Sequence, residues 1–189
     1  MEKLTITWKR GDPFLYLWLN EAEAEAHDPA KALLSLPCYN IVRNRNFTNP
    51  RDERALHLKK EVVSTSPVGK AKAFPYMPQL FPLGRWLISD IMRHPIEDAY
   101  LHPYFLVTNA KQKVKVWATD AGGGYDHETD VEVWDTAYGA HGSSSRTTLG
   151  CLRIGEVNDT GPNSPIEKLV AKIQPTISRK ETVNLWITE

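Results

Sequence analysis

The stretch Leu4–Trp18 reads LTITWKRGDPFLYLW, and it decides the architecture we expect for this chain. From Leu4 to Trp8, apolar and polar residues alternate, which is the period-two pattern of a half-buried β-strand. A Gly-Asp-Pro turn follows at residues 11–13, and the apolar run Phe14–Trp18 is typical of a second, largely buried strand. These features predict an N-terminal β-hairpin.

Further strand patterns recur along the chain, at Arg85–Ser89, Tyr104–Thr108, Lys113–Trp117, Val131–Trp134 and Glu181–Thr188. Helix is expected in fewer places. Glu21–Ala26 is interpreted as a solvated helical turn, and Pro29–Leu36 as carrying a short helix. A longer helix is predicted to begin after Ser164 as N-cap and to be limited by Pro175. Thirteen prolines and eleven glycines also favour short elements and turns, so we expect a mainly β protein.

The composition bounds the class of protein. A length of 189 residues with 41% apolar residues suits one domain over residues 1–189, in which residues 39–80 form a long polar loop or a lid. The net charge of zero gives no support for nucleic acid or an anionic membrane as partner. No segment is long and apolar enough to span a bilayer, and the N-terminus lacks the apolar core of a Sec signal. We therefore expect either a product made in the cytoplasm or a chain from which a signal has been removed.

The stretch most informative about chemistry is His141–Ile154, HGSSSRTTLGCLRI. A thiol is a good nucleophile only as thiolate, and an imidazole nearby can take its proton. Gly150 lets a substrate approach closely and offers a backbone N–H to an oxyanion. A lone cysteine is most often a core residue, but polar small residues before Cys151 and Arg153 after it are poor core sequence. The pattern therefore predicts Cys151 as nucleophile and His141 as base, and Cys38 as an inert free thiol.

These residues resemble the catalytic motif of the L,D-transpeptidase family. The ten-residue spacing from His141 to Cys151 is similar to that of the compact variant in some type VI secreted effectors. Phe81–Trp86 looks like the strand-entry segment of the family. Leu149 departs from the many members that carry a second histidine before Gly-Cys. The resemblance implies an L,D-transpeptidase-like β-sandwich with a C-terminal helix followed by a closing strand.

The resemblance also implies an activity. Cys151 would attack the peptidoglycan stem peptide and expel the terminal D-alanine, giving carboxypeptidase cleavage, D-amino-acid exchange or a cross-link. Thr148 would fix the motif loop, Gly150 would contribute to the oxyanion hole, and Tyr138 would bind substrate. Arg153 would either anchor a substrate carboxylate or brace the loop. An effector would act in a periplasm after delivery by a route other than Sec, and its producer would carry an immunity protein.

Two other function classes stay open. One is a non-catalytic cell-wall-binding or phage virion module with the same fold, for which Cys151 would be unreactive. The other is an unrelated cysteine amidase or peptidase with no preference for D-alanine. No cofactor is predicted, and no metal site, because His94, His102 and His127 lack the spacing of a ligand cluster. The glycines at 122–124 lack the strand–helix context of a phosphate-binding loop.

Overall fold

The computed structural model describes residues 2–39, 81, 83–95, 102–109, 112–118, 127–133, 139–142, 151–156, 159 and 161–189. The elements in these ranges, in chain order, are β1 (Thr5–Lys9), β2 (Phe14–Trp18), α1 (Glu21–Ala26), a 3-10 turn (Pro29–Lys31), β3 (Leu34–Tyr39), β4 (Gly84–Arg93), β5 (Tyr104–Asn109), β6 (Gln112–Ala118), β7 (His127–Val133), β8 (Gly139–His141), β9 (Leu152–Ile154), α2 (Pro165–Ser178) and β10 (Val183–Thr188).

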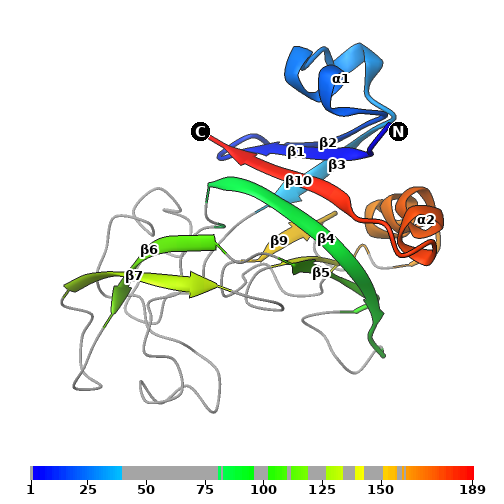
Figure 1. Cartoon of the computed structure of the whole chain (residues 1–189). Helices are drawn as coiled ribbons and strands as arrows, with labels where there is room; N and C mark the ends of the chain where they lie inside the picture. The colour runs from blue at the N-terminus through cyan, green and yellow to red at the C-terminus, as the bar shows by residue number, and fades with distance from the viewer. Residues whose placement is uncertain are drawn as a thin grey trace.

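Eight strands form a closed barrel in the order β1-β10-β4-β5-β8-β9-β3-β2, in which β2 pairs with β1 to complete the circle (Figure 1). Strands β6 and β7 form a separate antiparallel pair. The expectation of a mainly β chain is confirmed. The expectation of an L,D-transpeptidase-like β-sandwich is wrong, because the hydrogen-bonded ladder runs through all eight strands without a break.

Strand β4 explains how the sheet closes. It pairs with β10 through Gly84–Ile88 and with β5 through Leu87–Arg93, and the register shifts between Ile88 and Asp90. A bulge of this kind bends a strand and increases its twist, so one long strand can serve two walls of a barrel. The first and last strands of the chain, β1 and β10, then pair in parallel and leave no free edge between them.

The core lies inside the barrel and under α2. Inward-facing residues from all eight barrel strands and five apolar residues of α2 make one cluster of buried side chains. Helix α2 contacts both β3 and β4, which lie on opposite walls of the barrel, so it must cross one end of it. Figure 1 shows α2 beside β4 and β10. The buried stripe of α2 consists of Ile166, Leu169, Val170, Ile173 and Ile177.

Several local predictions are confirmed, among them the N-terminal hairpin, the helical turn Glu21–Ala26 and the closing strand. The short helix expected within Pro29–Leu36 is also present, as the 3-10 turn Pro29–Lys31, and β3 begins after it at Leu34. One prediction is wrong. Pro175 does not end α2, which continues to Ser178, because the last turn buries Thr176 and Ile177. That burial offsets the one hydrogen bond that the proline cannot donate.

Candidate active site

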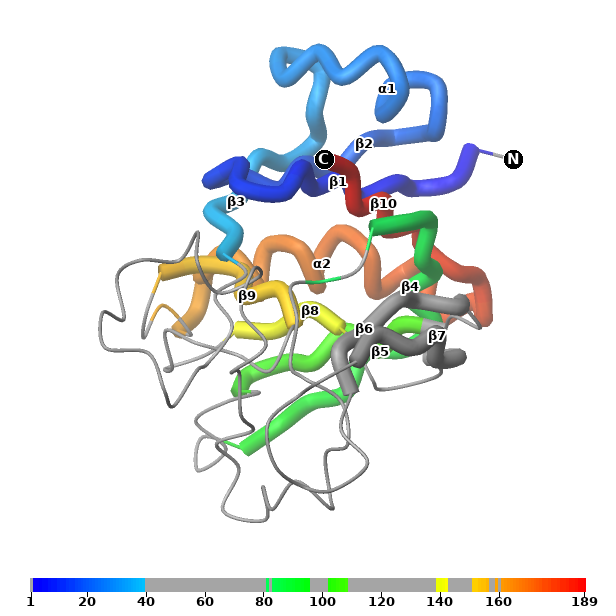
Figure 2. The backbone as a smooth tube through the Cα atoms, turned by 90° about the vertical axis from the view of Figure 1, so that its left-hand side faces the viewer, coloured from blue at the N-terminus to red at the C-terminus, as the bar shows by residue number. Residues whose placement is uncertain are grey.

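The parallel pair β8–β9 brings the two ends of the motif together. Ala140 lies opposite Leu152 and His141 opposite Arg153, as Figure 2 shows for the two adjacent strands. The same register, continued by one residue, sets Cys151 opposite Gly139. The backbone N–H of Gly139 is hydrogen-bonded to the Cys151 thiol, which agrees with this placement. The chain thus turns back between β8 and β9, which places the predicted base His141 and the predicted nucleophile Cys151 at the ends of neighbouring strands.

Alternation of side chains puts both groups on one face. Ala140, Leu152 and Ile154 belong to the core. His141 and Cys151, one residue away from core positions, therefore lie on the outward face of the barrel wall. Neighbouring strands are about 4.8 Å apart and two residues rise about 6.6 Å, so the Cα atoms of His141 and Cys151 are separated by roughly 8 Å. The combined length of an imidazole and a thiol side chain spans such a gap.

The protonation of the His141 ring follows from its hydrogen bond. Nδ1 lies 2.7 Å from the carbonyl oxygen of Gly142, and a carbonyl can only accept, so Nδ1 carries the hydrogen. This tautomer leaves the lone pair on Nε2, which is the nitrogen a base would use. The ring is 3% exposed and its centroid lies 6.3 Å from that of Phe105. His141 is therefore held in one orientation by the backbone and a neighbouring ring.

The two cysteines differ in environment. Cys38 is in the core, and burial strongly raises its pKa. Cys151 is half-buried and lies outside the core. Burial raises the pKa of Cys151 to about 11, although the Gly139 N–H opposes this. At neutral pH the Cys151 thiol is therefore protonated, so it becomes a nucleophile only if a base takes its proton during attack. The prediction of two free thiols agrees with the structure, in which no disulfide joins them.

Arg153 lies between His141 and Tyr39, and the sequence analysis had not predicted Tyr39 as part of the site. Tyr39 of β3 pairs with Arg153 of β9, so His141, Arg153 and Tyr39 form a row across three strands. The Arg153 side chain is buried, and its guanidinium carbon lies 4.6 Å from the centre of the Tyr39 ring. The Tyr39 hydroxyl donates a hydrogen bond to the carboxylate of Glu156. This bond raises the pKa of the Tyr39 phenol, so the hydroxyl keeps its hydrogen.

Two glycines let neighbouring groups approach the site closely. A Cβ added to Gly139 would meet Phe105 Cζ at 2.5 Å, and one added to Gly142 would meet Ile166 Cγ2 at 2.9 Å. The ring that contacts His141 therefore occupies the space above Gly139. Gly142, which follows His141, lies directly against the first turn of α2. Gly142, Phe105, Tyr39 and Glu156 were all missed by the sequence analysis, and only the glycine next to His141 left a local signal.

Other predicted residues cannot be placed. Tyr138, Thr148 and Gly150 lie outside the described residues, as do residues 40–80 of the predicted loop or lid and the glycines at 122–124. Within the described ranges, no group of three or more His, Cys, Asp or Glu side chains is arranged to hold a metal ion. None of the helices in those ranges is long and apolar enough to cross a membrane.

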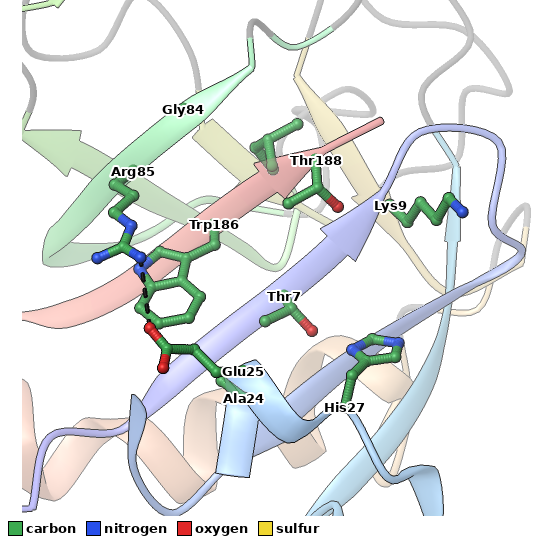
Figure 3. A pocket seen from close by; sticks show the side chains of 10 residues that line it. Thr7, Lys9, Ala24, Glu25, His27, Gly84, Arg85, Trp186 and Thr188 are labelled. Carbon is green, nitrogen blue, oxygen red and sulfur yellow. Dashed lines mark ion pairs between the residues drawn. The ribbon is translucent and has the colours of Figure 1, made fainter. Parts of the chain in front are cut away.

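A pocket of about 520 Å³ lies on the opposite wall of the barrel, between α1 and strands β1, β4 and β10. Three strands separate β10 from β9 in either direction around the barrel. In Figure 3, Arg85 covers the Trp186 ring at 4.4 Å and reaches Glu25 at 3.5 Å. His27 also lines the pocket, but its ring packs against Trp18. No cysteine or serine is among the lining residues, so this pocket is not a candidate site for chemistry with a cysteine or serine nucleophile.

Comparisons with known proteins identified no relative of this chain. No protein-family model, curated protein or solved structure matches the chain.

Proposed function

We propose that the protein is a cysteine-dependent acyl transferase that acts on tetrapeptide stems of peptidoglycan. One observation carries the chemistry: β8 and β9 pair in parallel, so that His141 and Cys151 share one face, with His141 Nδ1 bonded to the Gly142 carbonyl. The substrate class comes from the likeness of the His141–Cys151 motif to that of L,D-transpeptidases. The closed barrel differs from the sandwich that this likeness implied, so the proposal depends on the site residues and not on the fold.

In the proposed reaction, His141 Nε2 removes the thiol hydrogen as Cys151 Sγ attacks the carbonyl carbon of the third stem residue. The Sγ–C bond forms and the carbonyl π electrons move onto oxygen, where backbone N–H groups of Gly150 and Cys151 would stabilise the negative charge. As the tetrahedral intermediate collapses, the C–N bond breaks. The departing amine of D-alanine takes the proton from the His141 imidazolium. The product is a thioester on Cys151.

A second nucleophile then resolves the thioester. His141 takes a proton from the incoming water or amine, a new C–O or C–N bond forms, and the C–S bond breaks to return the thiol. Water gives a tripeptide stem, a D-amino acid gives an exchanged stem, and the amine of another stem gives a cross-link. His141 and Cys151 would catalyse all three reactions. Peptidoglycan lies outside the cytoplasmic membrane, so the protein would have to act there, as a delivered antibacterial effector would.

One observation favours a second candidate, a non-catalytic wall-binding module. Burial raises the pKa of Cys151 to about 11, which is the opposite of the shift seen in preformed thiolates. In such a module, Cys151 would be a packing residue and its replacement would leave binding to peptidoglycan intact. The acyl transferase requires His141 to act in concert with the attack, and so predicts that both residues are indispensable.

Muropeptide analysis separates these candidates. Purified protein is incubated with tetrapeptide-containing peptidoglycan beside the Cys151→Ala and His141→Gln variants, and the fragments are analysed by mass spectrometry. The acyl transferase predicts loss of terminal D-alanine with the unsubstituted protein and at least a thousandfold less with either variant, on the order seen for unit-acting catalytic residues. No change with folded, unsubstituted protein would contradict it. Equal sacculus binding by all three proteins without turnover would favour the module.

A further inference from the structure

Phe105 is a buried aromatic residue on the outward face of the barrel wall. Its neighbour on β5, Leu106, belongs to the core, so strand alternation places the Phe105 side chain on the opposite, outward face. Phe105 is nevertheless only 6% exposed. Its register partner on β8 is His141, which lies on the same outward face. The ring therefore lies beside the proposed catalytic pair and not among the side chains that fill the barrel.

The absence of a side chain at Gly139 makes this placement of the ring possible. Gly139 and His141 are two residues apart on β8, so their Cα–Cβ directions both point outward. A Cβ on Gly139 would lie 2.5 Å from Phe105 Cζ and 2.6 Å from Phe105 Cε2. The tip of the ring thus fills the volume that a side chain at residue 139 would need. In that place the ring lies beside the imidazole, with 6.3 Å between the ring centroids and an angle of 31° between the ring planes.

Gly139 also connects the Phe105 ring to the nucleophile. The backbone N–H of Gly139 is hydrogen-bonded to the Cys151 thiol, while the ring lies against the Cα of the same glycine. The ring and the thiol therefore adjoin one residue from two sides. An apolar ring at this place excludes water from the thiol, in agreement with the pKa of Cys151, which burial raises to about 11.

The His141 ring needs support beyond its hydrogen bond to act as a base. The bond from Nδ1 to the Gly142 carbonyl sets the tautomer, but a hydrogen bond does not by itself fix the tilt of an imidazole. A flat apolar ring beside the imidazole restricts that tilt by steric contact. Proton transfer from Cys151 Sγ to His141 Nε2 depends on such alignment, because a misplacement of about 1 Å can cost on the order of a hundredfold in rate.

We propose that Phe105 is a positioning residue for acyl transfer, whose ring, placed against Gly139, holds the His141 imidazole in line with the Cys151 thiol. This inference rests on the proposed function. A phenylalanine ring can neither accept nor donate the proton that is transferred, so Phe105 acts through His141. It also lies outside the stretch His141–Ile154, and β5 brings it to the site from elsewhere in the chain.

The kinetic test compares Phe105→Leu with the unsubstituted protein on a tetrapeptide donor. Leucine keeps the site apolar but offers no flat face to the imidazole. We expect kcat to fall about ten- to hundredfold with KM within about twofold, because misalignment slows the chemical step and leaves substrate binding intact. Phe105→Met retains more of the side-chain volume and should lower kcat in the same way, so it serves if Phe105→Leu folds poorly.

A spectroscopic measurement reports on the imidazole itself. In the unsubstituted protein, the nitrogen-15 chemical shifts of His141 should show a protonated Nδ1 and an unprotonated Nε2, since Nδ1 donates to Gly142. In Phe105→Leu and Phe105→Met, both shifts should move toward the averaged values of a ring that changes orientation. His141→Gln identifies the signals by their loss.

Phe81→Leu is the matched control. Phe81 is fully buried inside the barrel and packs edge-on against Trp86, with 5.1 Å between the ring centroids. Its replacement removes the same atoms from a buried ring and should lower the stability of the fold. The kinetic constants and the His141 signals should nevertheless stay unchanged.

The outcomes separate the inference from the function on which it rests. An equal loss of kcat in Phe81→Leu would mean a general effect of core packing and would overturn the inference. An unchanged kcat in Phe105→Leu and Phe105→Met, or a lower kcat with unchanged His141 signals, would overturn it while leaving the acyl transferase in place. Folded unsubstituted protein that turns over no tetrapeptide donor would overturn the proposed function and the inference together.

Discussion

In the proposed site, the backbone carbonyl of Gly142 takes the place beside His141 that a carboxylate side chain holds in many catalytic triads. The Gly142 oxygen accepts from Nδ1 at 2.7 Å and so fixes the tautomer in which Nε2 is basic. A carbonyl is neutral, so it orients the ring without the full charge that would stabilise an imidazolium. This fits a site in which the thiol stays protonated until substrate arrives.

The state of the Cys151 thiol can be measured directly. Burial disfavours the charged thiolate, so the folded-state pKa is raised and the thiolate appears only at high pH. We expect ultraviolet thiolate absorbance, taken as the difference between unsubstituted protein and Cys151→Ser, to rise with a midpoint at about pH 11. Because the pKa is raised above its ordinary value of 9.0, the thiol stabilises the fold below that pH, and this contribution is lost as pH rises toward 11.

Cys38 serves as the internal control for that titration. It is 1% exposed and burial raises its pKa even further, so Cys38→Ser should leave the difference signal unchanged. Brief alkylation should likewise label Cys151 before Cys38. A thiolate signal at neutral pH that depends on His141 would contradict the protonated thiol and would indicate a preformed ion pair.

The glycines beside the base allow a second prediction. A methyl group at Gly139 would lie 2.5 Å from Phe105 Cζ and 2.6 Å from the Leu106 carbonyl oxygen, which neither neighbour can accommodate without a shift. We expect Gly139→Ala and Gly142→Ala each to lower the free energy of unfolding by about 1–3 kcal/mol. Urea denaturation measures this. Gly161→Ala is the control, because nothing lies within 4 Å of a Cβ at that position, and an equal loss there would contradict the steric explanation.

At the scale of elements, the buried side chain of Asn184 is one of the contacts that hold α1 on the barrel. Asn184 of β10 donates from Nδ2 to Thr5 Oγ1 at 3.2 Å and to Glu21 Oε1 at 2.7 Å. The amide thus links β10, β1 and the first residue of the helix. Since α1 has only six residues, it depends on such contacts rather than on its own helical propensity.

Removal of that amide should therefore loosen α1. We expect Asn184→Ala to lower the free energy of unfolding by about 1–3 kcal/mol, because Glu21 and Thr5 lose a buried partner. Hydrogen exchange should increase first in α1. Gln174→Ala, which removes an exposed hydrogen bond to Ser178, should change neither quantity. Unchanged exchange in α1 of Asn184→Ala would show that other contacts hold the helix.

Sequence periodicity was a good guide to elements whose pattern is local. Alternation over Leu4–Trp8 and the apolar run Phe14–Trp18 identified both strands of the hairpin, and Ser164 as N-cap identified the start of α2. The prediction failed at Pro175, which was expected to limit α2 but lies inside it. There the burial of Thr176 and Ile177 in the last turn outweighed the local effect of the proline.

For the whole molecule, closure of the barrel was beyond the reach of sequence reasoning. It depends on β1 pairing with β10, whose residues are about 180 positions apart in the chain, and on a bulge in β4. Neither leaves a periodic trace. The same holds for Tyr39, which meets Arg153 only because β3 and β9 are neighbours. The motif predicted the pair His141 and Cys151 because both lie within one local stretch.

A closed barrel has a consequence for stability. Leu185 is fully buried on β10, between β1 and β4, so Leu185→Ala leaves a cavity at the point of closure. We expect a loss of about 2–5 kcal/mol in the free energy of unfolding. Circular dichroism and tryptophan fluorescence should report one common transition of the barrel in urea, since none of its eight strands is an edge strand. Leu19→Ala, at an exposed position, should be nearly neutral. Separate transitions would contradict a single closed unit.

The central claim is that Cys151 forms a covalent acyl intermediate with the peptidoglycan stem. Intact-mass analysis after rapid quenching with a tetrapeptide donor tests it most directly. The account predicts an adduct equal to the donor minus D-alanine, mapped to the peptide that contains Cys151, absent from Cys38 and abolished in His141→Gln. Release of D-alanine by Cys151→Ala, or neither adduct nor release with folded unsubstituted protein, would contradict it.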